Sequence, residues 1–378
     1  MGPLIVLDKS AIQSFSRDEV WMLTKHYLVV VVPVLLFEVL GDLKKEGRDG
    51  RLGQDDVTWL AGKLLDSDSK LNVPYQAACI ESMLGNDPAS GFVLLGGAKK
   101  IEGNDGRRGV FFDEPKEYEV LRNWRAGRYS EAEELMAEDW RQTTAEIDLE
   151  GIRKTYSERF KNIPAPRTVE QIVAVVDDLL MKDDIKLKSD LLTTLLDFIQ
   201  GPEEFRNRIF DRWLKSGMPR LAEFSPYSNY CLRTLLVFYG GVAYGVISTR
   251  ATNRVDLEYF FYAHFGYVFC SNDKFHRQLA PYVLGPFHTF VQADDLKKDL
   301  RWLHDEWAGL SEAEREQRAY DYGSYPPQNA DSITAQLWVK YMRPWTPGSG
   351  NRALRMTEEE KEKLIEELKP FIDALDKQ

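Results

Sequence analysis

The sequence predicts an α/β fold whose parallel β-sheet is interrupted by a largely α-helical insertion. Two continuous apolar runs near the start of the chain, Leu4–Leu7 and residues 27–32, have the composition of central strands covered on both faces. A third strand is expected much later, at residues 267–270, whereas helical periodicity dominates residues 55–224. These observations favour a Rossmann-like, three-layer core assembled from two separate parts of the chain.

We therefore divide the chain into four segments. Residues 1–50 and 225–303 should form the two parts of the core, residues 51–224 the helical insertion, and residues 304–378 a helical C-terminal extension. A glycine-rich sequence at residues 47–53 marks the first boundary.

Capping boxes mark the starts of several expected helices. In this motif a Ser or Thr is followed three residues later by a Glu, and the two residues satisfy backbone donors reciprocally. The chain has such pairs at Ser16 and Glu19, Ser311 and Glu314, and Thr357 and Glu360. They predict helices at residues 16–25, after residue 311, and at residues 357–377. Apolar periodicity predicts further helices at residues 33–45 and 294–307.

Composition and charge limit the class of protein. The 378 residues are 43% hydrophobic and 29% charged, which is globular, and the three cysteines are too scattered for a zinc site or a disulfide framework. Residues 230–247 are apolar but contain Arg233 and three glycines, so a buried helix is favoured over a membrane span. Without a basic segment at its start, the chain is expected to be cytoplasmic. The net charge of −11 argues against a general nucleic-acid binder, but not against an enzyme with a locally basic cleft.

Four acidic residues occupy equivalent places relative to the predicted elements. Asp8 ends the first strand, Glu38 lies in the apolar helix after the second, Asp256 is expected to cap the helix before the third, and Asp273 follows that third strand. Strand carboxyl ends and helix starts lie on one edge of a parallel sheet, so these acids can converge. For Asp8, a helix cap or an Asx-turn is an equally good interpretation.

Several carboxylates in one small site repel one another unless a cation neutralises them. Oxygen ligands suit Mg²⁺ or Mn²⁺, and the sequence places no His or Cys in a pattern that indicates zinc. Two further acids leave alternatives open. Glu258 stands near Asp256 in sequence and competes with it, and Asp42 shares a helix face with Glu38 but is more simply a solvated residue.

Basic and amide residues beside the four acids are candidates for holding an anionic substrate. They are Lys9, Arg250, Arg254, Asn272 and Lys274. The two lysines can equally well balance their acidic neighbours. For His276 a packing or surface role is favoured over a contact to phosphate. The arginine-rich segment at residues 203–220 indicates either a solvated surface helix or a helix that contacts phosphates.

These motifs together resemble the PIN-like nuclease superfamily. The resemblance covers residues 3–45 and 253–303, with Asp8, Glu38, Asp256 and the Ser-Asn-Asp sequence ending at Asp273 in the places of the four acidic motifs. It implies a parallel sheet between helices and a metal-dependent endonuclease in which the four acids hold Mg²⁺ or Mn²⁺. The resemblance also implies RNA as substrate in preference to DNA. The long insertion departs from the usual compact domain.

Two other functions remain open at this point. A PIN-like scaffold can serve as a non-catalytic binding or assembly module, with the insertion as a surface for a protein partner or a second copy. The same acids can also serve a phosphohydrolase that acts on small phosphate esters. No membrane partner is expected.

Overall fold

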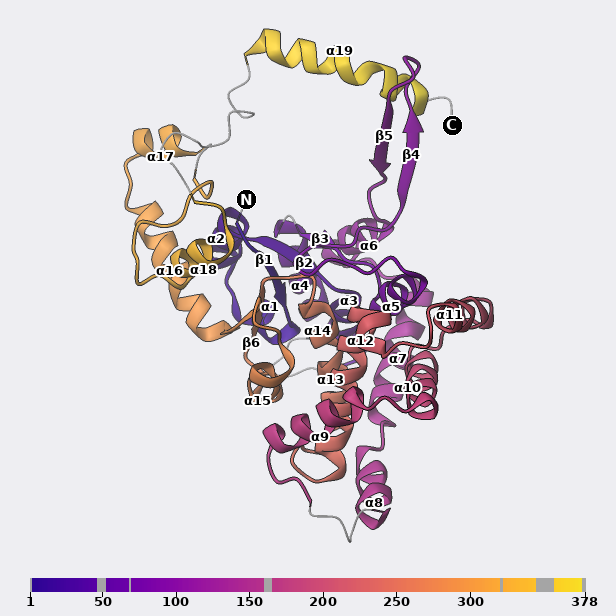
Figure 1. The fold of residues 1–378 in the computed structure, drawn as a ribbon. Coiled ribbons are helices and arrows are strands. Elements are labelled where there is room, and N and C mark those ends of the chain that lie inside the picture. The colour runs from indigo at the N-terminus through magenta and orange to yellow at the C-terminus, as the bar shows by residue number, and fades with distance from the viewer. Residues whose placement is uncertain are drawn as a thin grey trace.

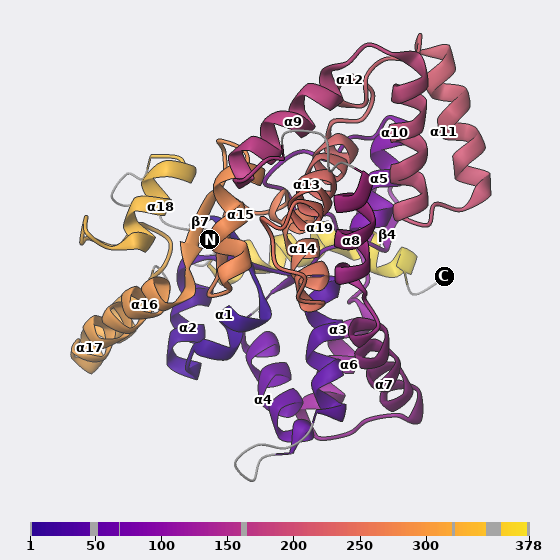
Figure 2. The same cartoon turned by 90° about the horizontal axis from the view of Figure 1, so that it is seen from below.

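Buried β-branched and aliphatic side chains build the central sheet. A computed structural model describes residues 2–45, 52–67, 69–159, 165–319, 322–344 and 357–375. Five parallel strands run in the order β3-β2-β1-β6-β7; Figure 1 labels β3, β2, β1 and β6, and Figure 2 labels β7. Their bounds are β1 (Leu4–Leu7), β2 (Leu28–Val31), β3 (Lys70–Leu71), β6 (Val268–Ser271) and β7 (Thr289–Gln292).

Strand β1 lies at the centre of this sheet and is buried on both sides. Ile5, Val6 and Leu7 are at most 1% exposed. Successive side chains of a strand point to opposite faces, so helices must cover both faces of the sheet. The predicted α/β class with a helix–sheet–helix arrangement is therefore confirmed.

The order of the strands places a switch point beside β1. From β1 the chain proceeds outward through β2 to β3, and its second part proceeds outward in the other direction from β6 to β7. The β1–β6 pair, with Ile5 opposite Val268, therefore joins the two predicted parts of the core. In open α/β sheets the crevice at such a switch point, beyond the carboxyl ends of the strands, is where ligands bind.

The helices of the core pack in two main groups (Figures 1 and 2). The first group contains α1 (Lys9–Ser14), α2 (Arg17–His26), α4 (Gly53–Asp66) and α16 (Ala293–Ala308). The second contains α13 (Pro226–Ala243), α14 (Thr252–Ala263) and α15 (Lys274–Val283), and α3 (Pro33–Gly41) contacts α1 and α4 of the first group and α14 of the second. The segment predicted as one helix at residues 33–45 ends at Gly41 and continues as the short 3-10 helix η1 (Asp42–Lys44).

The predicted insertion is mostly helical, with two exceptions. Its helices include α5 (Tyr75–Leu84), α6 (Lys116–Arg125), α7 (Glu131–Ala145), α8 (Leu149–Arg159), α9 (Val169–Met181), α10 (Ile185–Phe198), α11 (Glu203–Lys215) and α12 (Leu221–Phe224). It also contains β3, which pairs with β2, and a projecting hairpin of β4 (Ala98–Glu102) and β5 (Arg108–Phe112) (Figure 1). The central sheet thus extends past the boundary placed at residue 51.

The C-terminal extension is helical in its described parts. It contains α17 (Glu312–Arg318), α18 (Ile333–Tyr341) and α19 (Glu358–Leu375), and α19 packs against the hairpin. The capping boxes predicted at Ser16 and Ser311 are formed, and Thr357 exchanges the equivalent bonds with Glu360. Residues 47–51 of the predicted boundary loop and residues 376–377 of the predicted terminal helix lie outside the described residues.

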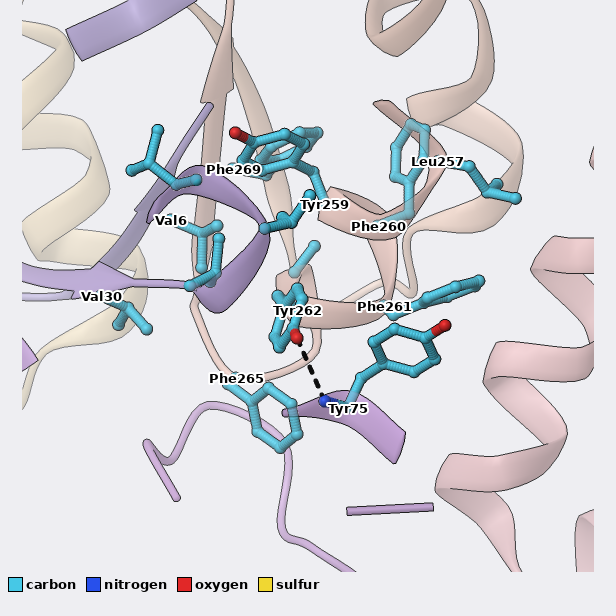
Figure 3. Packing of buried hydrophobic residues seen from close by; sticks show 14 of the residues in the cluster. Val6, Val30, Tyr75, Leu257, Tyr259, Phe260, Phe261, Tyr262, Phe265 and Phe269 are labelled. Atoms are coloured by element: carbon cyan, nitrogen blue, oxygen red, sulfur yellow. Dashed lines mark hydrogen bonds between the residues drawn. The ribbon is translucent and has the colours of Figure 1, made fainter. Parts of the chain in front are cut away.

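An aromatic core supports the second group of helices. Four successive residues of α14, Tyr259, Phe260, Phe261 and Tyr262, are at most 1% exposed. Phe260 packs against Phe269 of β6, whereas Phe261 and Tyr262 pack against Tyr75 of α5 (Figure 3). Because close-packed neighbours surround this part of α14, the helix is held in place. It is therefore a rigid support for the side chains that it carries. Within the described ranges, no helix is both long and apolar enough to cross a membrane.

Candidate functional site

Asp8 lies directly beyond β1, where it caps a helix. It also belongs to the acidic cluster, as we call the four predicted acids Asp8, Glu38, Asp256 and Asp273. Its Oδ1 accepts a hydrogen bond of 2.8 Å from the Ala11 amide at the start of α1. Ser271 Oγ donates to its Oδ2 at 2.6 Å, and Ser10 Oγ lies within 2.9 Å of both oxygens. The side chain is buried, with the residue 3% exposed. The two interpretations of Asp8 from sequence are therefore compatible.

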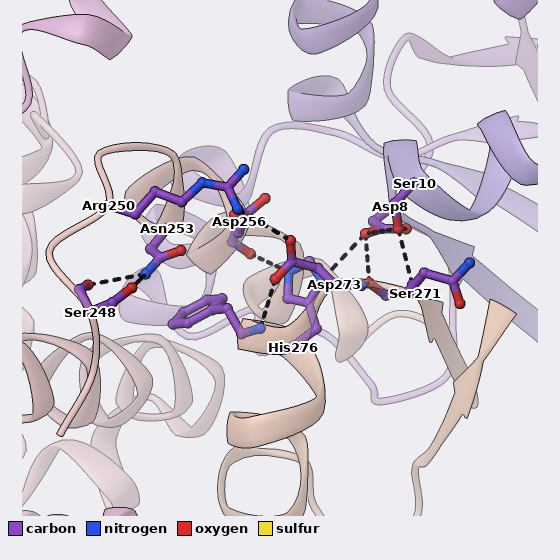
Figure 4. A network of polar contacts seen from close by, with 11 residues as sticks. Asp8, Ser10, Ser248, Arg250, Asn253, Asp256, Ser271, Asp273 and His276 are labelled. Atoms are coloured by element: carbon purple, nitrogen blue, oxygen red, sulfur yellow. Dashed lines mark hydrogen bonds and ion pairs between the residues drawn. The ribbon is translucent and has the colours of Figure 1, made fainter. Parts of the chain in front are cut away.

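Asp273 occupies the matching position beyond β6. It caps α15 by accepting from the Phe275 amide at 2.7 Å, and its own amide donates to Ser271 Oγ at 2.9 Å. Its Oδ2 lies 4.0 Å from Nη1 of Arg250 (Figure 4). Ser271 thus connects Asp8 and Asp273, which end neighbouring parallel strands.

The prediction that Asp256 caps its helix is wrong. Helix α14 begins four residues earlier, at Thr252, so Asp256 lies inside its second turn. The side-chain amide of Asn253 donates to the carbonyl oxygen (3.0 Å) and Oγ (2.8 Å) of Ser248, which closes the preceding loop and allows the earlier start. From this position the carboxylate still faces the cluster.

One oxygen of the Asp256 carboxylate has no protein partner. Its Oδ2 is buried and accepts no hydrogen bond from the described residues. The pKa of Asp256 is raised to about 7, chiefly by burial; the charge of His276 lowers it, and the charges of Glu38, Asp273 and Asp8 raise it. The other three predicted acids therefore lie within electrostatic reach of Asp256.

Glu38 reaches the cluster from α3 and is held by Tyr259, whose hydroxyl donates to its Oε2. Burial raises the pKa of Glu38, whereas Lys9 and the bond from Tyr259 lower it and the charge of Asp8 raises it. Glu38 therefore belongs to the same buried group of carboxyls as Asp8 and Asp256.

His276 lies at the centre of the cluster, although the sequence favoured a surface or packing role. Its Nδ1 is 2.8 Å from Ser271 Oγ and 3.4 Å from Asp8 Oδ2, and its Nε2 is 2.8 Å from the Asp256 carbonyl oxygen. Burial lowers its pKa, but the bond and charge of Asp8 and the charge of Asp256 outweigh burial and raise the pKa to about 9. The available signal was its place in the first turn of a helix that starts at the carboxyl edge of the sheet.

Two of the predicted substrate-binding cations, Lys9 and Arg254, form ion pairs with acidic residues of the protein itself. Lys9 Nζ donates to the Glu38 carbonyl oxygen at 2.9 Å and pairs with Asp42 at 2.7 Å. Asp42 is only 4% exposed, which corrects its interpretation as a solvated residue. Lys9 therefore links α1 to the end of α3 instead of facing a ligand.

Arg254 also forms an ion pair within the protein. It pairs with Glu258 at 3.1 Å and its guanidinium carbon lies 4.9 Å from the centre of the Phe198 ring. Glu258, the alternative to Asp256 as a metal ligand in the sequence, is therefore neutralised by Arg254. Between these two acids, Asp256 is the one with a buried carboxylate oxygen that has no hydrogen-bond partner among the described residues.

The other candidates for substrate contact lie on the outside of the cluster. The Arg250 side chain is 64% exposed and Lys274 is exposed. Asn272 exchanges two hydrogen bonds with Asp294, an acid after β7 that sequence reasoning did not select. In α11, Arg206 and Arg212 bond backbone carbonyls of neighbouring segments, which supports the structural interpretation of that helix.

The cluster has the donors for a hard cation but not a preassembled ligand set. Among residues in the described ranges, no group of three His, Cys, Asp or Glu side chains is arranged to hold a metal ion. The carboxylate oxygens of Asp8 are engaged by Ser10 and Ser271, whereas Asp256 Oδ2 is unpartnered. A cation at this site would therefore bind Asp256 at no cost in hydrogen bonds and would compete with serine donors for Asp8.

Comparison with known proteins found no matching family model, curated protein or solved structure.

Proposed function

We propose that the chain is a metal-dependent endonuclease that resembles the PIN-like superfamily and acts on RNA. The observation that carries this proposal is the buried, unpartnered Oδ2 of Asp256 among other carboxyls at the switch point of a parallel sheet. A buried carboxylate oxygen without a partner is costly unless a proton or a cation compensates it. Ligand sites of open α/β sheets lie in this crevice.

The chemistry of the donor set fits Mg²⁺ or Mn²⁺. Asp8, Glu38, Asp256 and Asp273 offer only oxygen atoms, which these ions prefer. A bound ion would activate water and stabilise the charge that develops on a phosphodiester. Arg250 lies 4.0 Å from Asp273 and Lys274 follows it in sequence, and both are exposed, so they are proposed to hold the backbone phosphates. RNA as substrate follows from the family resemblance alone.

The test is cleavage of end-labelled single-stranded RNA and DNA with Mn²⁺ or Mg²⁺, comparing the wild type with Asp8→Asn and Asp273→Asn. Asparagine caps helices about as well as aspartate, so both variants should keep α1 and α15. The matched control is Asp184→Asn, because Asp184 also caps a helix, α10, but is exposed in the insertion. We expect metal-dependent RNA cleavage that only the first two substitutions abolish. Cleavage that survives both of them contradicts the proposal.

A non-catalytic binding module is the second candidate. It is favoured by one observation, the lack of a preassembled group of three ligands among the described residues. The same experiment separates the two functions if a Mn²⁺ titration is added. A wild-type protein that neither binds Mn²⁺ nor cleaves any polymer supports the module, whereas hydrolysis of p-nitrophenyl phosphate without polymer cleavage supports a phosphohydrolase.

A further inference from the structure

The ring of His276 contacts all four acids either directly or through one intermediate residue. It touches Asp8 at 3.4 Å and the backbone of Asp256 at 2.8 Å. Ser271 connects it to Asp273, and Tyr259, whose ring lies 5.7 Å away, connects it to Glu38.

Aromatic side chains prevent this ring from turning. The ring is fully buried and meets Phe269 at 4.9 Å and Phe260 at 5.3 Å between centroids, with planes at 73° and 87°. Closely packed aromatic neighbours fix one orientation of a buried ring, since rotation would require several of them to move. The two nitrogen atoms therefore point at fixed targets.

Each nitrogen atom serves a different half of the site. On the Nδ1 side, Ser271 Oγ donates to Asp8 and accepts from the Asp273 amide, so this contact orders the ends of β1 and β6. On the Nε2 side the partner is a carbonyl oxygen, which can only accept, so Nε2 carries a hydrogen and donates it to Asp256. This second contact fixes α14 relative to the sheet (Figure 4).

We propose that His276 is a positioning residue, whose ring sets the separation of the Asp8 and Asp256 carboxylates and thereby makes the cluster able to bind a divalent cation. The inference rests on the proposed function for its consequence, but the geometric role can be tested without it. Partners that orient metal ligands are typically worth about 10–100-fold in metal affinity or activity.

Two substitutions separate the two contacts. Asparagine places a polar atom near the position of Nδ1, so His276→Asn retains the link to Ser271. Glutamine reaches the position of Nε2, so His276→Gln retains the link to the Asp256 carbonyl, and His276→Ala removes both. The matched control is His26→Gln, because His26 is also buried, at 2% exposure, but its ring nitrogens have no partner among the described residues.

Mn²⁺ affinity is measured by calorimetry, together with kcat and KM for RNA cleavage, on variants that show a cooperative unfolding transition. We expect His276→Ala to lose about 10–100-fold in Mn²⁺ affinity and kcat with little change in KM, and the Asn and Gln variants to lose less. His26→Gln should change the unfolding temperature alone. A folded His276→Ala variant with Mn²⁺ affinity and kcat within about twofold of wild type overturns the proposal.

If the wild type binds no metal and cleaves nothing, the proposed function is refuted. A second measurement then still tests the positioning role of His276. Crystal structures of the wild type, His276→Gln and His276→Ala then compare the positions of the two carboxylates. A displacement in His276→Ala beyond about 0.5 Å, reduced in His276→Gln, supports the positioning role, and unchanged positions overturn it.

Discussion

His276 at the carboxyl edge of the central sheet and His26 at its amino edge are both buried, yet their pKa values move in opposite directions. The pKa of His26 is lowered to about 4, chiefly by burial. Burial lowers the pKa of His276 too, but Asp8 and Asp256 reverse the effect and raise it to about 9. Burial disfavours a charged imidazole everywhere, so the carboxylates decide the difference.

The surroundings of the two histidines differ in how completely charged groups are matched. At the amino edge, Trp338 donates to the His26 carbonyl at 3.0 Å and Tyr27 bonds Thr334 at 3.0 Å, so α18 closes that edge. At the carboxyl edge, Asp256 keeps an unpartnered oxygen and Arg250 is exposed. The neutral ring of His26 also lacks hydrogen-bond partners among the described residues, so the unmatched charge, rather than any unmatched polar atom, indicates the end where a ligand is expected.

Removal of the charge on Asp8 should abolish the contrast between the histidines, and this is the largest effect we expect. In Asp8→Asn the pKa of His276 should fall from about 9 to below its ordinary value of 6.5, because burial then dominates. The measurement is an NMR titration of the histidine side chains in metal-free buffer, with the pKa of His26 as internal reference. A His276 pKa that stays above 8 would show that Asp8 is not the cause.

Loss of Asp299 should damage the amino edge without affecting the acidic cluster. Its carboxylate accepts from the Ile333 and Thr334 amides at 3.1 and 2.9 Å and from the Ser332 and Thr334 hydroxyls at 3.1 and 2.6 Å. We expect Asp299→Ala to lower the free energy of unfolding by about 3 kcal/mol, since several donors lose a charged acceptor. Urea unfolding and Mn²⁺ titration test this together. A tenfold change in Mn²⁺ affinity would contradict the separation of the two edges.

Asp256 should make the metal-free protein less stable as the pH rises. Its folded-state pKa of about 7 lies above its unfolded value of 3.8, so the folded state holds the extra proton and its stabilisation is lost between these pH values. We expect the wild type to lose roughly 2 kcal/mol more than Asp256→Asn between pH 5 and pH 6.5. The measurement is urea unfolding with a chelator present. Parallel curves for the two proteins would rule out the raised pKa.

Arg250→Gln should have the smallest effect on stability, within about 0.5 kcal/mol, because the side chain is mostly exposed. If Arg250 holds the substrate, this variant should raise KM for RNA and weaken the salt dependence of binding. Lys9→Met is the informative comparison, since it breaks the pair with buried Asp42 and should lower stability instead. The reverse pattern would show that Lys9, not Arg250, meets the substrate.

Local patterns were sufficient to locate many of the elements. The apolar run at Leu4–Leu7 is β1, and the Ser16 and Ser311 boxes begin helices, because each depends on residues close together in sequence. The prediction for the start of α14 was wrong: the helix begins at Thr252, where Asn253 bonds Ser248 of the preceding loop, and periodicity does not report such a contact.

The candidate site could be predicted in outline for the same reason. Asp8 and Asp273 follow strands, and parallel strands end at one edge of a sheet, so their convergence needed only the order of the elements. The pairs Lys9 with Asp42 and Arg254 with Glu258 could not be predicted. Several charged groups were available to each acid, and only the packing of the helices selects the partner.

By itself the sequence determined where β1, β2 and β6 lie, where several helices begin, and that acidic residues follow those strands. Only the tertiary structure decided that β3 joins the sheet and that Asp42 is neutralised by Lys9. It also decided that His276 lies among the acids while Asp256 keeps a free oxygen. Periodicity reports how a segment faces a core, whereas charge partners are set by contacts between residues far apart in the chain.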